Sequence, residues 1–224
     1  MIATINGVLL DLDFECISEA LRSRILGGRY ERRETEILPR LIEENESVLE
    51  LGGGIGYVSS LIHKTGKCGN LAVVEAHPGL MPVIERNHEL NNVTATVIHG
   101  VAVASAAKGE ANFYLHEHFW TSSTHAPVGG ARQERIKAVD VRELIERLAV
   151  SFLICDIEGG EDGLFENLSL DGVNKVVVEQ HPKVVGEHAA EKVAAALRRQ
   201  NFYRCEKTSC RNFDVFFKNV FQAQ

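Results

Sequence analysis

The chain has 224 residues, of which 45% are hydrophobic and 25% are charged, and its formal net charge is −7 at pH 7. This is an ordinary globular composition, and the length suits one large domain or a domain with a small appendage. Because the negative charge leaves no basic stripe for a polyanion to follow, we expect no nucleic-acid partner.

The first segment, residues 1–46, has the pattern of a β-hairpin followed by helices. Asn6 and Gly7 lie between two β-like runs, and this dipeptide is typical of a two-residue hairpin turn. The rest of the segment has a helical pattern, in which Pro39 should kink or restart the helix. We therefore predict an N-terminal hairpin and helical cap in front of a domain that spans residues 47–224.

From residue 47 onward, short apolar runs alternate with amphipathic helical patterns. Strands that are buried on both faces require such near-continuous apolar runs, so the pattern predicts an α/β fold with a doubly wound, mostly parallel sheet of about seven strands. The last two runs are close together and should form an antiparallel hairpin at the sheet edge. The expected strands are 47–52, 71–76, 94–101, 151–157, 175–180, 202–209 and 213–219, and the expected helices are 57–64, 79–92, 141–148, 161–168 and 187–200.

An insertion at about residues 103–139 interrupts this series. Two β-like runs, 111–118 and 134–139, predict an inserted β-hairpin. The long loop between them holds Trp120 and mixes hydroxyl side chains with glycines, so it is a candidate lid over an acceptor site. A disordered hairpin tip is the alternative interpretation of the same loop.

A glycine-rich turn, "SVLELGGGIGYV" at residues 47–58, follows the first strand of the series. A dinucleotide fingerprint that starts at Gly52 would need a third glycine where Tyr57 stands. Glu50 precedes the first glycine by two residues, and a carboxylate there suits an ammonium group and would repel a pyrophosphate. Glu75 ends the next strand, where it can accept hydrogen bonds from both hydroxyls of a ribose. The pattern therefore predicts an adenosine ligand with a positively charged amino-acid tail.

These motifs resemble the FkbM family of class I methyltransferases, which use S-adenosylmethionine and are known for O-methylation of hydroxyls on sugars and polyketides. The resemblance covers about residues 30–182, and its most specific part is "DIEGGE" at 156–161, which matches the family pattern D-x-E-G-x-E. "LELGGGIGYVS", "VVEAHPGL", "NHELNN" and "AVDVREL" support it. The chain departs from the family at Glu50, where Asp is usual, and at Gly53-Gly54, where Ala-Asn is usual. It also departs at Ile154, where Lys is frequent, and in "EAHP", where E-P-N-P is commoner.

The resemblance implies a Rossmann-like fold, S-adenosylmethionine as cofactor and S-adenosylhomocysteine as product. It implies that Glu50 faces the methionine amino group, that Glu75 binds the ribose, and that residues 100–102 lie along the adenine. The implied cofactor-binding residues are Glu50, Gly52, Gly53, Gly54, Gly56, Tyr57, Glu75, Ala76, His77, Gly100, Val101, Ala102 and Asp156.

Methyl transfer to an alcohol also requires that donor and acceptor be collinear and that the hydroxyl proton be removed. Asp156 and Glu158 follow one strand and Glu179 and His181 follow the next, so all four are predicted catalytic residues that converge over the methyl group. His181 is the expected base because its unperturbed pKa is near neutrality. Helix N-capping is the alternative for Glu158 and Glu161. A divalent metal would lower the pKa of the acceptor, but no ligand spacing demands one, so no metal residue is predicted.

The expected function is thus O-methylation of a hydroxyl on a small molecule or a carbohydrate. A non-catalytic protein that binds S-adenosylmethionine is one alternative, and a nicotinamide-dependent oxidoreductase, which Tyr57 and Glu50 disfavour, is another. Five cysteines without a C-x-x-C pair, together with the lack of a signal peptide or a membrane-spanning run, predict a cytoplasmic protein with no membrane partner.

Overall fold

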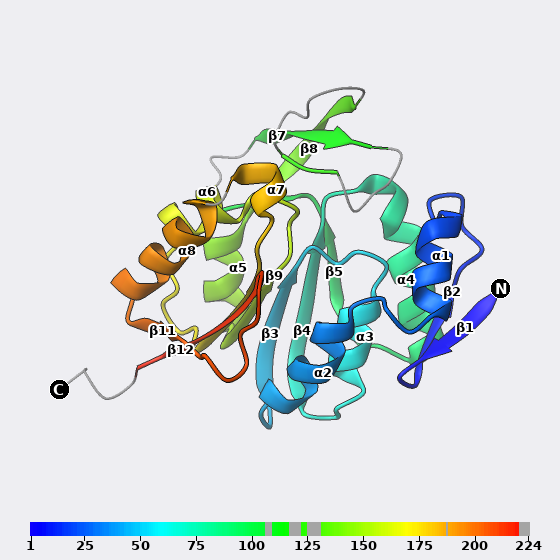
Figure 1. Ribbon diagram of the computed structural model, residues 1–224, viewed down its shortest axis with the longest axis horizontal. Coiled ribbons are helices and arrows are strands. Elements are labelled where there is room, and N and C mark those ends of the chain that lie inside the picture. Colours follow the sequence, from blue (N-terminus) through cyan, green and yellow to red (C-terminus); the bar gives the residue numbers. More distant parts are fainter. Residues whose placement is uncertain (106–108, 117–121, 125–130, 187, 220–224) are drawn as a thin grey trace.

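The computed structural model describes residues 1–105, 109–116, 122–124, 131–186 and 188–219 (Figure 1). Within these ranges no helix is long and apolar enough to cross a bilayer. The strands are β1 (Ile2–Ile5), β2 (Val8–Asp11), β3 (Glu46–Leu51), β4 (Cys68–Glu75), β5 (Thr96–His99), β6 (Val101–Val103), β7 (Glu110–Leu115), β8 (Arg132–Asp140), β9 (Phe152–Cys155), β10 (Lys175–Glu179), β11 (Phe202–Arg204) and β12 (Phe213–Lys218). The helices are α1 (Glu19–Leu26), α2 (Arg32–Leu41), α3 (Tyr57–His63), the 3₁₀ turn η1 (Pro78–Leu80), α4 (Met81–Asn91), α5 (Val141–Leu148), α6 (Glu161–Asn167), α7 (Pro182–Val185) and α8 (His188–Arg199).

A seven-stranded sheet forms the centre of the molecule, with the order β11-β12-β10-β9-β3-β4-β5. Strands β5, β4, β3, β9 and β10 are parallel, whereas β12 and β11 are antiparallel at one edge. The predicted fold class is confirmed, including the strand count and the antiparallel edge. The strand order reverses between β3 and β9, and the crevice beyond the strand ends at such a switch point is where open α/β sheets bind ligands.

Helices cover both faces of this sheet, which explains why its strands are apolar on both sides. One face packs on α5, α6 and α8, and Leu49 and Leu51 of β3 belong to the same buried cluster as Leu144, Phe165 and Leu197 of these helices. The opposite face packs on α2 and α3. Figure 1 shows the two helix layers on either side of the sheet. Since Leu49 and Leu51 face α5, α6 and α8, alternation along β3 directs Glu50 toward the layer that contains α2 and α3.

The N-terminal segment forms the predicted hairpin, β1 and β2, and two helices. The helical stretch breaks between Gly27 and Glu31, and Pro39 lies inside α2 near its end, so the helix does not restart at Pro39, whereas a kink there stays a prediction. The paired glycines supply the flexibility for the break, and a proline in the last turn removes only one helical hydrogen bond. Side chains of the hairpin and α1 share one apolar cluster with α3 and α4. The division of the chain at residue 46 stays a prediction.

The third apolar run, residues 94–101, was expected to form one strand. In the structure it divides at Gly100. β5 stays in the central sheet, and β6 leaves it to pair in parallel with β8. A Cβ atom on Gly100 would lie 2.4 Å from the Val139 side chain and 2.7 Å from the carbonyl oxygen of Lys137. The glycine therefore allows β8 to cross closely over the end of β5.

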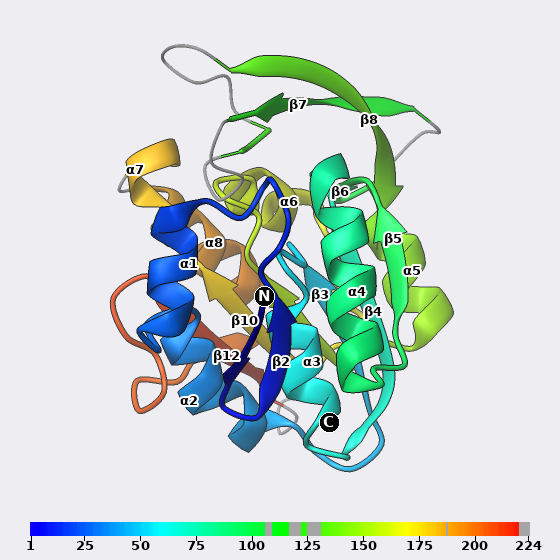
Figure 2. The ribbon, with the colours of Figure 1, turned by 90° about the vertical axis from the view of Figure 1, so that its right-hand side faces the viewer.

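The insertion contains the predicted antiparallel pair, β7 and β8, and β6 extends it to a three-stranded sheet. Figure 2 shows this small sheet at the top of the molecule, on the same side as α7. Trp120 and the centre of the proposed lid lie outside the described residues. At the C-terminal edge, the run 202–209 is a strand only over Phe202–Arg204, so the link to β12 is longer than expected.

Candidate active site

A cavity of about 800 Å³ lies at the carboxyl ends of β3, β4, β9 and β10. The N-terminal part of α2, the small sheet and α7 complete its walls. Every predicted cofactor or catalytic residue except Gly56 lines this cavity. The cofactor-side group in the lining is Glu50, Gly52, Gly53, Gly54, Tyr57, Glu75, Ala76, His77, Gly100, Val101 and Ala102, and the second group is Asp156, Glu158, Glu179 and His181.

Contacts within the protein explain why the turn after β3 contains glycines. Gly52 has φ +89°, and a Cβ atom there would lie 1.7 Å from the carbonyl oxygen of Asp156. At Gly53 a Cβ would lie 2.5 Å from the Val73 side chain. Gly54, with φ +53°, donates its N–H to Oε2 of Glu75 at 2.9 Å. The glycines thus bring β3, β4 and β9 together at the point where the strand order reverses.

Glu75 is anchored at the end of β4 and is only 7% exposed. Its Oε2 accepts from Gly54 and its Oε1 accepts from the backbone N–H of His77 at 2.6 Å. Burial raises the pKa of Glu75 to about 7, although these backbone N–H groups oppose the shift. A carboxylate oxygen has more than one lone pair, so both oxygens can still accept from a ligand.

Glu50 is the most deeply buried acid on the cofactor side, with 2% of its surface exposed. Its Oε2 has no hydrogen-bond partner among the described residues. Burial raises the pKa of Glu50 to about 8. A buried carboxyl group with an unpaired oxygen is expensive to maintain unless a donor or a cation approaches it.

We expect Glu50→Gln to stabilise the ligand-free protein, and the gain to grow with pH. Above about pH 5 this carboxyl is ionised in the unfolded chain, but in the folded protein it holds its proton up to about pH 8. The wild type therefore loses stability as pH rises between these values, and the variant does not share that loss. Urea unfolding at pH 5.5 and 8.5 should show a relative gain of about 2–4 kcal/mol at the higher pH. Parallel pH profiles for the two proteins would mean that Glu50 is ionised in the folded state.

Contacts within the protein explain the presence of two predicted cofactor-binding residues, Gly56 and Tyr57. Gly56 is the N-cap of α3 with φ +76°, and a Cβ there would lie 3.3 Å from the His88 ring, away from the cavity. The hydroxyl of Tyr57 accepts from Asn6 at 2.9 Å and lies 2.8 Å from Thr35 Oγ1. Tyr57 lines the cavity and also ties the glycine turn to the N-terminal segment.

The residues after β4 and β5 form the next part of the wall. Nδ1 of His77 accepts from the Gly79 N–H at 3.1 Å and so caps η1. Nε2 of His99 lies 3.2 Å from the carbonyl oxygen of Ala76. Gly100 donates its N–H to the carbonyl oxygen of Glu75 at 2.9 Å, which places Val101 beside the cavity.

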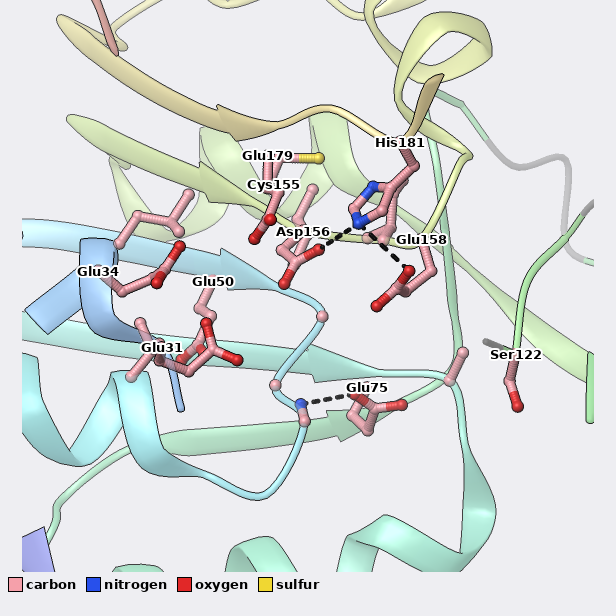
Figure 3. A pocket seen from close by; sticks show the side chains of 18 of the residues that line it. Glu31, Glu34, Glu50, Glu75, Ser122, Cys155, Asp156, Glu158, Glu179 and His181 are labelled. Carbon is pink, nitrogen blue, oxygen red and sulfur yellow. Dashed lines mark hydrogen bonds and ion pairs between the residues drawn. The ribbon is translucent and has the colours of Figure 1, made fainter. Parts of the chain in front are cut away.

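The second predicted group also meets in one place (Figure 3). Nε2 of His181 lies 3.5 Å from Oδ1 of Asp156 and 3.2 Å from Oε2 of Glu158. The strand β9 ends at Cys155 and Glu158 has φ +53°, so the approach of these acids results from a turn and not from strand alternation as expected. On its other side, Nδ1 of His181 lies 2.8 Å from Oε1 of Glu161.

These neighbours change the protonation of His181. Burial alone would lower its pKa, but the hydrogen bond to Glu161 and the charges of Asp156 and Glu158 raise the pKa of His181 to about 10. A histidine with this pKa carries its proton at neutral pH and is not available as a base, contrary to the expectation from its unperturbed value. Burial raises the pKa of Glu158 to about 7, and burial with the charges of Glu179 and Glu158 raises the pKa of Asp156 well above its usual range.

Acids from the N-terminal segment extend this group. Glu31 adopts φ +44° between α1 and α2, and its carboxylate approaches those of Asp156 and Glu179. Burial and the charge of the nearby Glu34 raise the pKa of Glu31 well above its usual range. Ligand atoms of Asp156, Glu158 and His181, and likewise those of Glu31, Asp156 and Glu179, lie within 4.8 Å of one another.

Glu161 contacts His181, and the sequence did not predict this contact. It is 1% exposed, it accepts from the Gly159 N–H at 3.1 Å and it holds the ring of His181. An acid in the first turn of a helix usually stabilises the helix N-terminus. The neighbouring sequence does not distinguish this role from a contact with a distant histidine. Gln180, which is buried and lines the cavity, was also missed.

Comparisons with known proteins agree with the fold. No family model matches the chain, and no curated protein matches it. Among solved structures, the chain is similar to M. jannaschii TYW2 in complex with AdoMet, with a TM-score of 0.50, 14% identity, and coverage of 98% of this chain and 86% of that one. It is also similar to a precorrin-6y C5,15-methyltransferase from Geobacter metallireducens GS-15, with a TM-score of 0.50, 12% identity and coverage of 85% and 89%.

A putative caffeoyl-CoA O-methyltransferase from Staphylococcus aureus gives a TM-score of 0.51 at 10% identity, with 83% of this chain and 82% of that one covered. At these identities the comparisons establish the fold alone. The chain has the Rossmann-like α/β fold of these methyltransferase structures.

Proposed function

We propose that this protein transfers a methyl group from S-adenosylmethionine to a hydroxyl oxygen on a small molecule or a carbohydrate. The observation that carries the proposal is the pair of buried acids, Glu50 and Glu75, at the ends of adjacent strands in one cavity. They flank a glycine turn whose backbone is open to the cavity. A second set of acids stands across the cavity, where an acceptor would meet the methyl group.

The cofactor fits the two acids in different ways. The unpaired Oε2 of Glu50 suits the ammonium group of the methionine part, which would supply the cation that this buried oxygen lacks. Glu75 suits the ribose hydroxyls, because backbone N–H groups of Gly54 and His77 already hold both of its oxygens in place. The backbone around Val101 would border the adenine.

When bound, the cofactor supplies a methyl carbon whose bond to sulfur breaks as the acceptor oxygen bonds to it, with the electron pair left on sulfur. The chain's own residues orient the acceptor and take its proton. Nε2 of His181 faces Asp156 and Glu158 and orients both side chains, and in the absence of a metal ion the imidazole is protonated in their company. Glu179 lies beside them with a pKa raised by burial and by the charge of Glu34, which suits a proton acceptor.

Two further observations support this reading. The segment "DIEGGE" that resembles the FkbM pattern contributes Asp156, Glu158 and Glu161 to a single cluster around His181. The similar structures include one in complex with AdoMet and a putative O-methyltransferase. We propose the FkbM assignment, the catalytic domain at residues 47–224 and the hydroxyl acceptor on this basis.

Replacing Glu75 with alanine should weaken the binding of S-adenosylhomocysteine by about 1–3 kcal/mol, or roughly five- to 150-fold, because charged hydrogen bonds to the ribose are lost. Titration calorimetry would measure the change. Glu85→Ala provides the control, since Glu85 is an exposed acid on the nearby helix α4 and outside the cavity lining. Equal affinities for wild type and Glu75→Ala would remove Glu75 from the cofactor site.

A further inference from the structure

We propose that Asp156, Glu158 and His181 form the binding site for one divalent metal ion of the Mg²⁺ or Mn²⁺ class, which holds the acceptor hydroxyl. This inference deepens the proposed function and rests on it. Its starting point is the geometry of three ligand atoms from two strand ends: Nε2 of His181, Oδ1 of Asp156 and Oε2 of Glu158 (Figure 3).

Two of the three distances between these atoms are those of neighbouring ligands on one ion, and the third is at most 4.8 Å. Nε2 of His181 lies 3.5 Å from the Asp156 oxygen and 3.2 Å from the Glu158 oxygen. Adjacent ligands of an octahedron are separated by √2 times the bond length, so these separations correspond to bonds of about 2.3–2.5 Å. A contraction of a few tenths of an ångström would bring them to the bond lengths of Mg²⁺, about 2.0–2.1 Å.

The ring of His181 is oriented as a metal-bound histidine is. Its Nδ1 lies 2.8 Å from Oε1 of Glu161, which has 1% of its surface exposed. With Nδ1–H donating to this buried carboxylate, Nε2 faces Asp156 and Glu158, and an ion that displaces the Nε2 proton would bind the lone pair of this nitrogen. Histidine ligands commonly donate their second N–H to a carboxylate in this way.

A second observation concerns buried oxygens of this cluster that lack hydrogen bonds. Oε2 of the buried Glu161 and the buried Oδ1 of Asp156 have no hydrogen-bond partner among the described residues. The Asp156 oxygen is a proposed ligand atom and lies 3.5 Å from Nε2 of His181, whereas the Glu161 oxygen is outside the donor set and belongs to a side chain that is 1% exposed. Beyond it, the carboxylates of Glu31 and Glu179 approach Asp156 from the other side. A divalent ion would pair with the unpaired oxygen and offset this concentration of negative charge.

The ion would have a defined place in the reaction. Two carboxylates and one imidazole leave coordination positions open, and an acceptor hydroxyl in one of them would have a lowered pKa. Its proton would pass to Glu179, which is outside the ligand set, as the oxygen bonds to the methyl carbon and the carbon–sulfur bond breaks. The two carboxylates are ligands that suit Mg²⁺ and Mn²⁺, and Mn²⁺ accepts the single imidazole more readily than Mg²⁺ does.

Titration of the full-length protein with Mn²⁺, followed by electron paramagnetic resonance, tests the site without an acceptor. We expect one Mn²⁺ per chain with a dissociation constant of about 1 mM or lower, displaced by Mg²⁺. Asp156→Asn and His181→Gln should each weaken binding at least tenfold. Asp162→Asn is the matched control, because this acid in the first turn of α6 lies 3.5 Å from Lys192 and is not part of the cluster. Circular dichroism would verify that each variant is folded.

The metal proposal is overturned if the wild type binds no Mn²⁺ at millimolar concentration, or if folded Asp156→Asn and His181→Gln bind it as the wild type does. Calorimetry with S-adenosylhomocysteine on the same samples separates this result from the proposed function. Cofactor binding without Mn²⁺ binding would reject the metal and keep the methyltransferase. Mn²⁺ binding without cofactor binding would reject the methyltransferase.

Discussion

Replacing Gly52 with alanine should lower the free energy of unfolding by about 3–5 kcal/mol, because two penalties combine at this position. The residue has φ +89°, and its Cβ would lie 1.7 Å from the carbonyl oxygen and 2.7 Å from the carbonyl carbon of Asp156. Both are backbone atoms at the end of β9, so no side-chain rotation can relieve the clash. The end of β3 or the segment that carries Asp156 would have to move.

Gly66→Ala is the control for this experiment. Gly66 has φ +69°, but a Cβ atom there would meet nothing within 4 Å beyond its chain neighbours, so its substitution measures the cost of left-handed backbone alone, about 1–2 kcal/mol. Denaturant unfolding of the two variants would give the difference. If both lost the same stability, close contact between the glycine turn and Asp156 would not explain why glycine occupies position 52.

Asp156→Asn should reduce turnover about a hundredfold or more while leaving the affinity for S-adenosylhomocysteine nearly unchanged. Asp156 belongs to both groups of converging ligand atoms, one with Glu158 and His181 and the other with Glu31 and Glu179. The amide keeps the size of the side chain but removes the carboxyl group that positions the acceptor. Glu50 and Glu75, which are expected to hold the cofactor, are not altered.

The measurement has two stages. Cell extract incubated with wild-type protein and isotopically labelled S-adenosylmethionine identifies the methylated acceptor by mass spectrometry, and single-turnover kinetics on that acceptor then compare the variants. His181→Gln should show a similar loss, and Asp162→Asn should not. Wild-type turnover in both Asp156→Asn and His181→Gln would mean that the acids serve only the structure of the turn before α6.

The sequence was sufficient for the parts of the fold that depend on local patterns. Runs buried on both faces predicted the central strands, and the amphipathic pattern predicted α5 with the bounds that it has. Asp140 begins this helix by accepting from the N–H of Glu143. The division of the third run at Gly100 was not predictable, since the reason is the passage of β8 over it, about forty residues later in the chain. The same holds for the break after Gly27, which replaced the one expected at Pro39.

In the candidate site, too, contacts between residues distant in sequence could not be predicted. The spacing of Glu50, Gly52 and Glu75 was enough to propose a cofactor and to place all three at one cavity. The role of Glu161 depends on His181, which is 20 residues away in sequence, and a pattern of acids at a helix start contains no information about that contact. The altered pKa of His181 follows from the same contact, and for this reason its unperturbed value was a poor guide.

The central claim is that this cavity binds an adenosine ligand with a charged amino-acid tail and not a dinucleotide. Parallel calorimetric titrations of the wild-type protein with S-adenosylhomocysteine and with NAD test it most directly. We predict saturable binding of S-adenosylhomocysteine with a matching rise in thermal stability, and no comparable response to NAD. Tight binding of NAD without any response to S-adenosylhomocysteine would contradict the claim.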